Sequence, residues 1–150
     1  MSAPLELSFA VDCPADHAFD IWTTRIAMWW PADHTMSGDP DTVVIEGCVG
    51  GRIFERARDG AEHQWGVVTD WDPPRALAFT WHLGRDADDA TEVAVRFVSD
   101  DDAHTRVTIE HRGWERLAPD GDVRERTRDN WGHVVGHFAG YARAKERPEW

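Results

Sequence analysis

The sequence contains very few cysteines. Cys13 and Cys48 are the only two, and they lie too far apart for a zinc knuckle or a redox Cys-x-x-Cys motif. A reduced compartment suits such a chain, and we expect both thiols to be small buried side chains and not reagents. The cysteine count therefore excludes a domain held together by disulfides or by a cysteine-ligated zinc ion.

Long hydrophobic runs are also missing. No apolar stretch reaches the length of about 18 residues that a transmembrane helix needs. The N-terminal residues MSAPLELSFAV alternate in polarity, whereas a signal peptide has an apolar core behind basic residues. We therefore predict a cytoplasmic protein without a membrane anchor.

Basic residues are scarce relative to acidic ones. The chain has 16 Lys and Arg against 28 Asp and Glu, which gives a formal net charge of −12 at pH 7. Such a charge repels phosphate backbones and anionic lipid headgroups. We expect neither nucleic acid nor a membrane surface as a partner.

Three common catalytic motifs are absent: the GxSxG nucleophile elbow, the phosphate-binding loop and the dinucleotide fingerprint. The glycine pair Gly50-Gly51 lacks the strand-to-helix context that these motifs need. Hydride and phosphoryl transfer are therefore not expected, and neither is an organic cofactor.

Tryptophan, by contrast, is abundant. The chain has 150 residues, 41% of them hydrophobic, which suits a single domain with a sizeable core, and nine residues are tryptophan. Indole rings are large and rigid. They suit either the filling of a core or the lining of a cavity for a flat apolar ligand.

The last long pattern, Asp122 to Lys145, predicts an amphipathic helix. Its polar side carries Arg126, Asp129, His133 and His137. The wide apolar stripe on the other side needs a partner surface. At about 100° per residue that stripe consists of Val123, Thr127, Trp131, Val134, Val135, Phe138, Tyr141 and Ala142.

Segments of period two upstream predict the partner surface, an antiparallel sheet. Leu5 to Val11 is the first expected strand, and two short helices should follow between Pro14 and Trp30. We expect six further strands at Thr42 to Gly47, Gly51 to Ala57, His63 to Trp71, Arg75 to Leu83, and around Val93 to Phe97 and Thr105 to His111. The prediction is an α+β fold in one domain, residues 1–150, with a curved antiparallel sheet of about seven strands around the C-terminal helix.

This order of elements resembles the helix-grip fold of the START and birch-pollen-allergen superfamily, SRPBCC. Local sequences resemble the branch that is similar to the C-terminal domain of the activator of the heat-shock-protein-90 ATPase. The segments that carry the resemblance are AFDIWTTRIAMWWP (18–31), VGGRIFER (49–56), WGVVTDWDPPRALAFTWHL (65–83) and TRVTIEHRGWERL (105–117).

The resemblance implies an interior pocket between helix and sheet. It implies no single chemistry, because relatives include ligand carriers, cyclases and resistance proteins. Co-chaperone activity does not transfer with it, because we expect only the one domain and no N-terminal chaperone-binding part.

The residues that we expect to face this pocket are mostly aromatic. His111 would supply one oriented hydrogen bond or a proton to a bound molecule. The alternative is that these side chains fill the core, with His111 neutral and bonded to a backbone carbonyl. The predicted cavity residues are Trp22, Trp30, Trp65, Phe79, Trp81, His111, Trp131 and Phe138.

We therefore predict a binding domain for a small hydrophobic or aromatic molecule. One alternative is an enzyme of cyclase, hydrolase or isomerase type that uses His111 as acid or base, with Glu55 or Arg56 positioning the substrate. Another is a domain that binds a chaperone or other protein. Glu55 and Arg56 themselves are expected to form ion pairs on the sheet surface.

The HVVGH segment, His133 to His137, resembles the HExxH zinc motif, but Val134 occupies the position of the required glutamate. Both histidines lie on the polar side of the predicted helix, and His34 lies in an expected loop. We expect all three to be solvated and predict no metal site.

Gly132, Gly136 and Gly140 form a GxxxGxxxG row in the same helix. Each glycine costs roughly 0.8 to 1 kcal/mol relative to alanine, so the row favours close approach of another backbone. That backbone belongs either to the sheet or to a second copy of the chain, and homodimerisation is the hypothesis that follows.

Overall fold

The structure is a computed structural model that describes residues 5–82, 91–113 and 121–146, with the side chains of 128–142 in the last helix. The predicted order of elements is confirmed, although the second expected helix is a pair of short 3-10 turns. The elements are β1 (Leu5–Val11), α1 (Ala15–Thr23), η1 (Ile26–Met28), η2 (Ala32–His34), β2 (Pro40–Ile45), β3 (Arg52–Ala57), β4 (Glu62–Asp72), β5 (Ala76–Trp81), β6 (Thr91–Asp101), β7 (His104–Arg112) and α2 (Gly121–Glu146).

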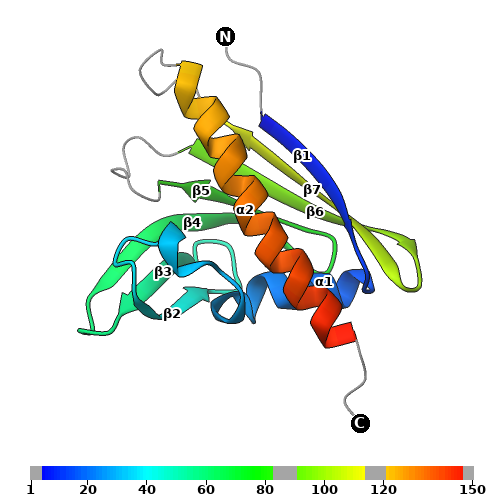
Figure 1. Cartoon of the computed structure of the whole chain (residues 1–150), viewed down its shortest axis with the longest axis horizontal. Coiled ribbons are helices and arrows are strands. Elements are labelled where there is room, and N and C mark those ends of the chain that lie inside the picture. Colours follow the sequence, from blue (N-terminus) through cyan, green and yellow to red (C-terminus); the bar gives the residue numbers. More distant parts are fainter. Residues whose placement is uncertain (1–4, 83–90, 114–120, 147–150) are drawn as a thin grey trace.

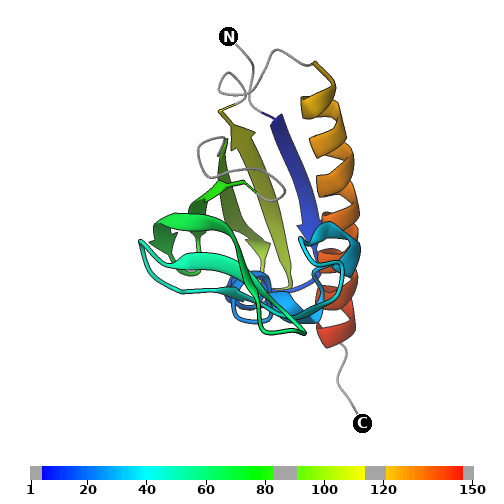
Figure 2. The same ribbon diagram turned by 90° about the vertical axis from the view of Figure 1, so that its left-hand side faces the viewer.

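The seven strands form one antiparallel sheet in the order β1-β7-β6-β5-β4-β3-β2. The sheet curls, and α2 runs diagonally across one of its faces (Figure 1). Seen from the side, the sheet and α2 form two layers (Figure 2). This is the predicted helix-grip arrangement.

Within residues 128–142, the apolar stripe of α2 packs on the sheet as predicted. Trp131, Val134, Phe138 and Ala142 are buried, whereas Gly132, Gly136 and the two histidines of the HVVGH segment are exposed. Because α2 carries many charged residues, it is unsuited to lipid. Within the residues that the structure describes, no helix is long and apolar enough to cross a membrane.

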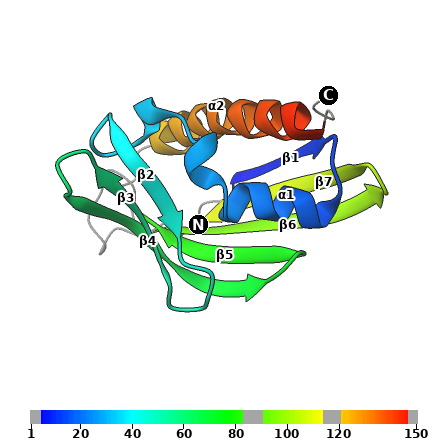
Figure 3. The same ribbon diagram turned by 90° about the horizontal axis from the view of Figure 1, so that it is seen from below.

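The short helix α1 lies between the sheet and α2, on the same side of the sheet (Figure 3). Its residues Ala18, Ile21 and Trp22 are at most 1% exposed. Phe19 makes edge-to-face contacts with Trp71 and Phe97, with ring centroids 5.2 and 5.4 Å away. The helix therefore closes one end of the space between sheet and α2.

Two bulges in β4 overturn one detail of the expected alternation. Trp65 has no partner on β3 and Thr69 has none on β5, so the side of the strand that faces inward changes twice. Regular alternation along His63 to Trp71 would place Val67 and Thr69 on the buried face with Trp65. Instead Val68 is buried, Val67 is half-buried and Thr69 is exposed.

Gly66 makes this bulged geometry possible. A Cβ atom at this position would lie 1.8 Å from the backbone oxygen of Thr80 on the neighbouring strand. Only glycine allows the two backbones to come so close. The position of the preceding Trp65 therefore depends on the absence of a side chain at residue 66.

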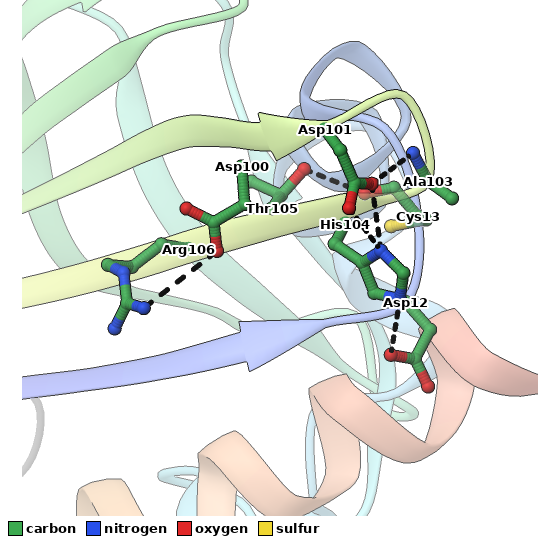
Figure 4. Close-up of polar contacts among 8 residues, drawn as sticks. All are labelled: Asp12, Cys13, Asp100, Asp101, Ala103, His104, Thr105 and Arg106. Carbon is green, nitrogen blue, oxygen red and sulfur yellow. Dashed lines mark hydrogen bonds and ion pairs between the residues drawn. The ribbon is translucent and has the colours of Figure 1, made fainter.

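The hairpin between β6 and β7 is tied to the end of β1 by polar contacts (Figure 4). Thr105 donates its hydroxyl to the backbone oxygen of Cys13 at 2.7 Å. His104 binds Asp101 at 2.8 Å and lies 3.8 Å from Asp12. The Asp101 carboxylate raises the pKa of His104, and the imidazolium form therefore strengthens this connection.

The expectation for the cysteines is correct for Cys13 and wrong for Cys48. Cys13 is buried, whereas Cys48 is exposed in the turn between β2 and β3. The backbone of this turn is held by Gly51, whose N–H donates to the oxygen of Cys48 at 2.9 Å. A turn residue has no periodic pattern from which burial could be predicted.

The glycine row of α2 faces solvent. A Cβ atom added at Gly132, Gly136 or Gly140 would meet no atom outside the local helix backbone within 4 Å. The sheet of the same chain therefore does not explain the row. Homodimerisation through it stays a prediction.

Replacement of Gly136 by alanine tests this explanation. In a monomer, Gly136→Ala should raise the free energy of unfolding by about 0.5–1 kcal/mol, because alanine favours the helix and meets no obstacle. Urea denaturation measures the change. Light scattering at high concentration provides the second readout, since dissociation of a wild-type dimer in the variant would show that the row makes an interface.

Candidate functional site

Four indole rings lie in contact with one another between α2 and the sheet. Trp30 lies 5.2 Å from Trp65 and 5.8 Å from Trp81, measured between ring centroids. Trp81 lies 5.7 Å from both Trp65 and Trp131. We refer to Trp30, Trp65, Trp81 and Trp131 as the indole cluster.

The other predicted cavity residues are attached to this cluster. Phe79 contacts Trp81 at 5.5 Å, and Trp22 stacks on Trp131 at 6.3 Å with 25° between the ring planes. Phe138 contacts Trp22 at 5.0 Å. With His111, which lies 6.2 Å from Trp131, all eight predicted residues form one connected array. That this array binds a ligand stays a prediction.

Hydrogen bonds hold three of the cluster's indoles in place. Each indole N–H donates to a fixed acceptor, so the rings keep their orientation. The bonds run from Trp30 to the backbone oxygen of His34 (2.9 Å), from Trp65 to the Glu55 carboxylate (2.9 Å) and from Trp131 to Nδ1 of His111 (3.1 Å).

His111 takes part in a chain of hydrogen bonds that fixes its tautomer. The Trp131 indole can only donate, so Nδ1 of His111 accepts and carries no proton. Nε2 then holds the proton of a neutral imidazole and donates it to the Thr91 hydroxyl at 2.5 Å. Thr91 donates in turn to the backbone oxygen of Trp81 at 3.2 Å. Both ring nitrogens of this buried histidine therefore support the indole cluster.

Removal of the Thr91 hydroxyl tests this role. Thr91→Val keeps the shape of the side chain but leaves the His111 N–H and the Trp81 carbonyl without this partner in a buried region. The free energy of unfolding should fall by about 1–3 kcal/mol. Urea denaturation measures the loss.

A matched control is Thr108→Val on the outer face of β7, where the side chain is half-buried. It should change stability by no more than about 0.5 kcal/mol. Equal effects of the two substitutions would contradict the hydrogen-bond chain.

Glu55 is the main correction to the predicted site. We expected a surface ion pair, but its side chain is 0% exposed and points into the protein. Its carboxylate accepts hydrogen bonds from the backbone N–H groups of Met36 and Ser37, the Ser37 hydroxyl and the Trp65 indole. For Arg56 the expectation is correct, because it is exposed and pairs with Glu62 at 3.0 Å.

Neighbouring side chains explain why the sequence pattern did not predict the burial of Glu55. Ile53, Phe54 and Glu55 are all buried, so β3 shows no alternation. Phe54 lies under the guanidinium group of Arg52, which is 4.3 Å from its ring centroid. Glu55 shares the parity of Ile53, which was the one signal that could have placed it inside.

Glu55 is ionised at neutral pH despite its burial. Burial by itself disfavours the carboxylate, but the hydrogen bonds from Ser37, Met36 and Trp65 outweigh that effect, and the pKa of Glu55 lies below its usual 4.5. The charge therefore fastens the segment at residues 36–37 to β3. The Glu55 carboxylate and both ring nitrogens of His111 are bonded to partners within the protein.

This depressed pKa predicts acid sensitivity. Stability from the Glu55 carboxylate is fully present above its unfolded-state pKa of about 4.3 and is lost as the pH falls toward the lower folded-state value. Glu55→Gln lacks this titration. The stability advantage of the wild type over the variant, measured by urea denaturation, should therefore shrink as the pH is lowered from about 6 to about 3. A constant difference across that range would contradict the assignment.

One polar atom in the array has no partner. The indole N–H of Trp22 is buried and makes no hydrogen bond within the described part of the chain.

Two hollows formed by described residues lie outside the indole cluster, although Phe79 of the array lines the smaller one. One of about 310 Å³ lies beside Thr23, Val43 and Trp71, and one of about 200 Å³ lies beside Ala78 and Arg112. Neither is lined by the indole cluster.

A curled antiparallel sheet, a long helix across it and an aromatic array between them define the helix-grip class, as in the SRPBCC superfamily. The family described as activator of Hsp90 ATPase homolog 1-like protein matches residues 12–143. The chain belongs to this family. No curated protein matches it.

Solved structures support the same assignment. The chain is 31% identical to an anthrahydroquino-γ-pyrone synthase, Txn09, complexed with a compound designated SUM, with coverage of 93% and 96% of the two chains and a TM-score of 0.66. It is 28% identical to CalC, a self-sacrificing resistance protein from Micromonospora echinospora, with 95% coverage of both chains and a TM-score of 0.74. An AHSA1-like protein from Aeromonas hydrophila is 23% identical, with coverage of 95% and 94% and a TM-score of 0.65, and shares the fold.

Proposed function

We propose that this protein binds a small, flat, apolar or aromatic molecule against the indole cluster. The observation that carries the proposal is the arrangement of Trp30, Trp65, Trp81 and Trp131, whose rings converge from four segments of the chain. Hydrogen bonds fix three of these indoles, so little conformational entropy is lost when a planar molecule stacks on them. Binding then depends mainly on ring contact and on exclusion of water.

The exposed end of the cluster is where such a molecule would make contact. Trp30 and Trp81 are each 9% exposed to solvent, whereas Trp65 and Trp131 are 0% and 3% exposed. A ligand that stacks on Trp30 and Trp81 can extend toward the Trp22 N–H only if the rings between them separate.

Two relatives add support from small-molecule biology. One is a synthase named for an anthrahydroquino-γ-pyrone product, and the other is a resistance protein. The first name describes a fused-ring compound, which is the shape that an indole cluster accommodates. We therefore favour polycyclic aromatic compounds over flexible aliphatic ones as ligands.

The arrangement of the polar groups favours ligand binding over acid-base catalysis. An acid or base needs a nitrogen or oxygen that can reach the substrate. Both nitrogens of His111 and both carboxylate oxygens of Glu55 are instead bonded within the protein. These groups hold the indoles in position.

Tryptophan fluorescence tests the binding proposal. Titration with anthraquinone should quench emission to saturation, and decanoic acid should not. Trp81→Phe should weaken anthraquinone binding about three- to tenfold, because the smaller ring loses stacking contact. Trp71→Phe is the matched control, since Trp71 packs on Phe19 outside the cluster, and it should leave the affinity unchanged. Quenching that never saturates, or that falls equally in both variants, would contradict the proposal.

An enzyme of cyclase type is the second candidate, favoured by the 31% identity to a synthase. Mass spectrometry of the compound after incubation separates the two functions. Recovery of unchanged anthraquinone supports binding alone. Conversion of a polyketide-like substrate that Thr91→Val or His111→Gln slows, at an unchanged level of folded protein, would support catalysis. A chaperone-binding role stays a prediction.

A further inference from the structure

Polar side chains from two segments that are distant in sequence meet on the surface beside the indole cluster. Asp33 and His34 belong to η2, and His133 belongs to α2. The Asp33 carboxylate lies 2.9 Å from Nδ1 of His34 and 3.6 Å from Nε2 of His133. The two imidazoles stack at 4.8 Å with 21° between their planes. One ligand atom from each of the three residues lies within 4.8 Å of the others.

These distances suit a small divalent ion. Zinc binds imidazole nitrogen and carboxylate oxygen at about 2.0–2.2 Å in a tetrahedron, which places neighbouring ligand atoms roughly 3.3 Å apart. The two Asp33 separations lie on either side of that value, and the two imidazole nitrogens lie within 4.8 Å of each other. The side chains of Asp33 and His133 are 69% and 46% exposed, so they can make the remaining adjustment without disturbing the core.

The electrostatics also suit a cation. The sequence carries a formal charge of −12, which raises the local concentration of cations. Two imidazoles with one carboxylate form a donor set that first-row divalent ions accept.

We propose that Asp33, His34 and His133 form a binding site for a divalent transition-metal ion such as Zn²⁺, with water in the remaining position. The ion would join η2 to α2. Because the Trp30 indole donates to the backbone oxygen of His34, it would also fix the Trp30 corner against the helix. His137 lies one turn further along α2, 4.8 Å from His133 between ring centroids, and is available as a further ligand.

This site departs from the expectation of no metal site. HVVGH lacks the glutamate of the zinc motif, and its histidines are exposed on α2 as expected. The additional ligands come from η2, about 100 residues upstream. Only the packing of η2 beside α2 brings them together (Figure 3).

Metal titration of the purified protein tests the proposal. After removal of bound metal with EDTA, Zn²⁺ should bind with one-to-one stoichiometry in calorimetry, and Co²⁺ should give the visible absorption of a tetrahedral site. His34→Ala and His133→Ala should each weaken Zn²⁺ binding at least about tenfold. His63→Ala on β4 is the matched control and should bind like the wild type.

Three results would overturn the proposal. The first is a wild-type dissociation constant no better than about 1 mM. The second is equal binding by the wild type and the His34→Ala, His133→Ala and His63→Ala variants. The third is binding that survives Asp33→Ala and His34→Ala but disappears in His133→Ala and His137→Ala, which would assign the ion to the helix pair alone. Circular dichroism confirms that each surface variant is folded. Anthraquinone binding is measured separately, so failure of one proposal leaves the other intact.

Discussion

The inner face of the sheet and one face of α2 both carry large apolar side chains, and each face needs the other to exclude water. Trp131 and Phe138 supply the helix side of this contact, and Trp65 and Trp81 supply much of the sheet side. Burial of one such ring contributes about 1.5–3 kcal/mol, so a few of them determine where the helix lies. The position of α1, the curl of the sheet and the order of the aromatic array all follow from covering this surface.

The polar groups within this apolar layer act as supports for the rings. A buried donor or acceptor without a partner is costly, and among the described residues of this layer the Trp22 N–H is an exception to full pairing. His111 and Thr91 form one support beneath Trp131, and Glu55 forms another behind Trp65. The layer is therefore a set of aromatic surfaces held in fixed orientations by hydrogen bonds.

Periodicity was enough to predict the antiparallel sheet, the long helix and seven of the eight aromatic and histidine residues that meet between them, because each depends on a repeat within its own segment. Trp30 lies between two short helical turns and belongs to no such repeat. Periodicity failed where the repeat is interrupted. The bulges in β4 reversed the facing of Val67 and Val68, and the covered outer position of Phe54 concealed the inward direction of Glu55. It also could not place His34 against His133, since no local pattern records which loop a helix will contact.

The pairing of β1 with β7 has a consequence for how the chain is made. Leu5 lies opposite His111, so one of the first strands to be synthesised finds its neighbour only after most of the polypeptide exists. Closing so long a loop is entropically costly and slows folding. Until then the indoles of the middle strands have no helix over them. During synthesis on a ribosome, the sheet would therefore expose its apolar side chains to water until α2 has been made and can cover them.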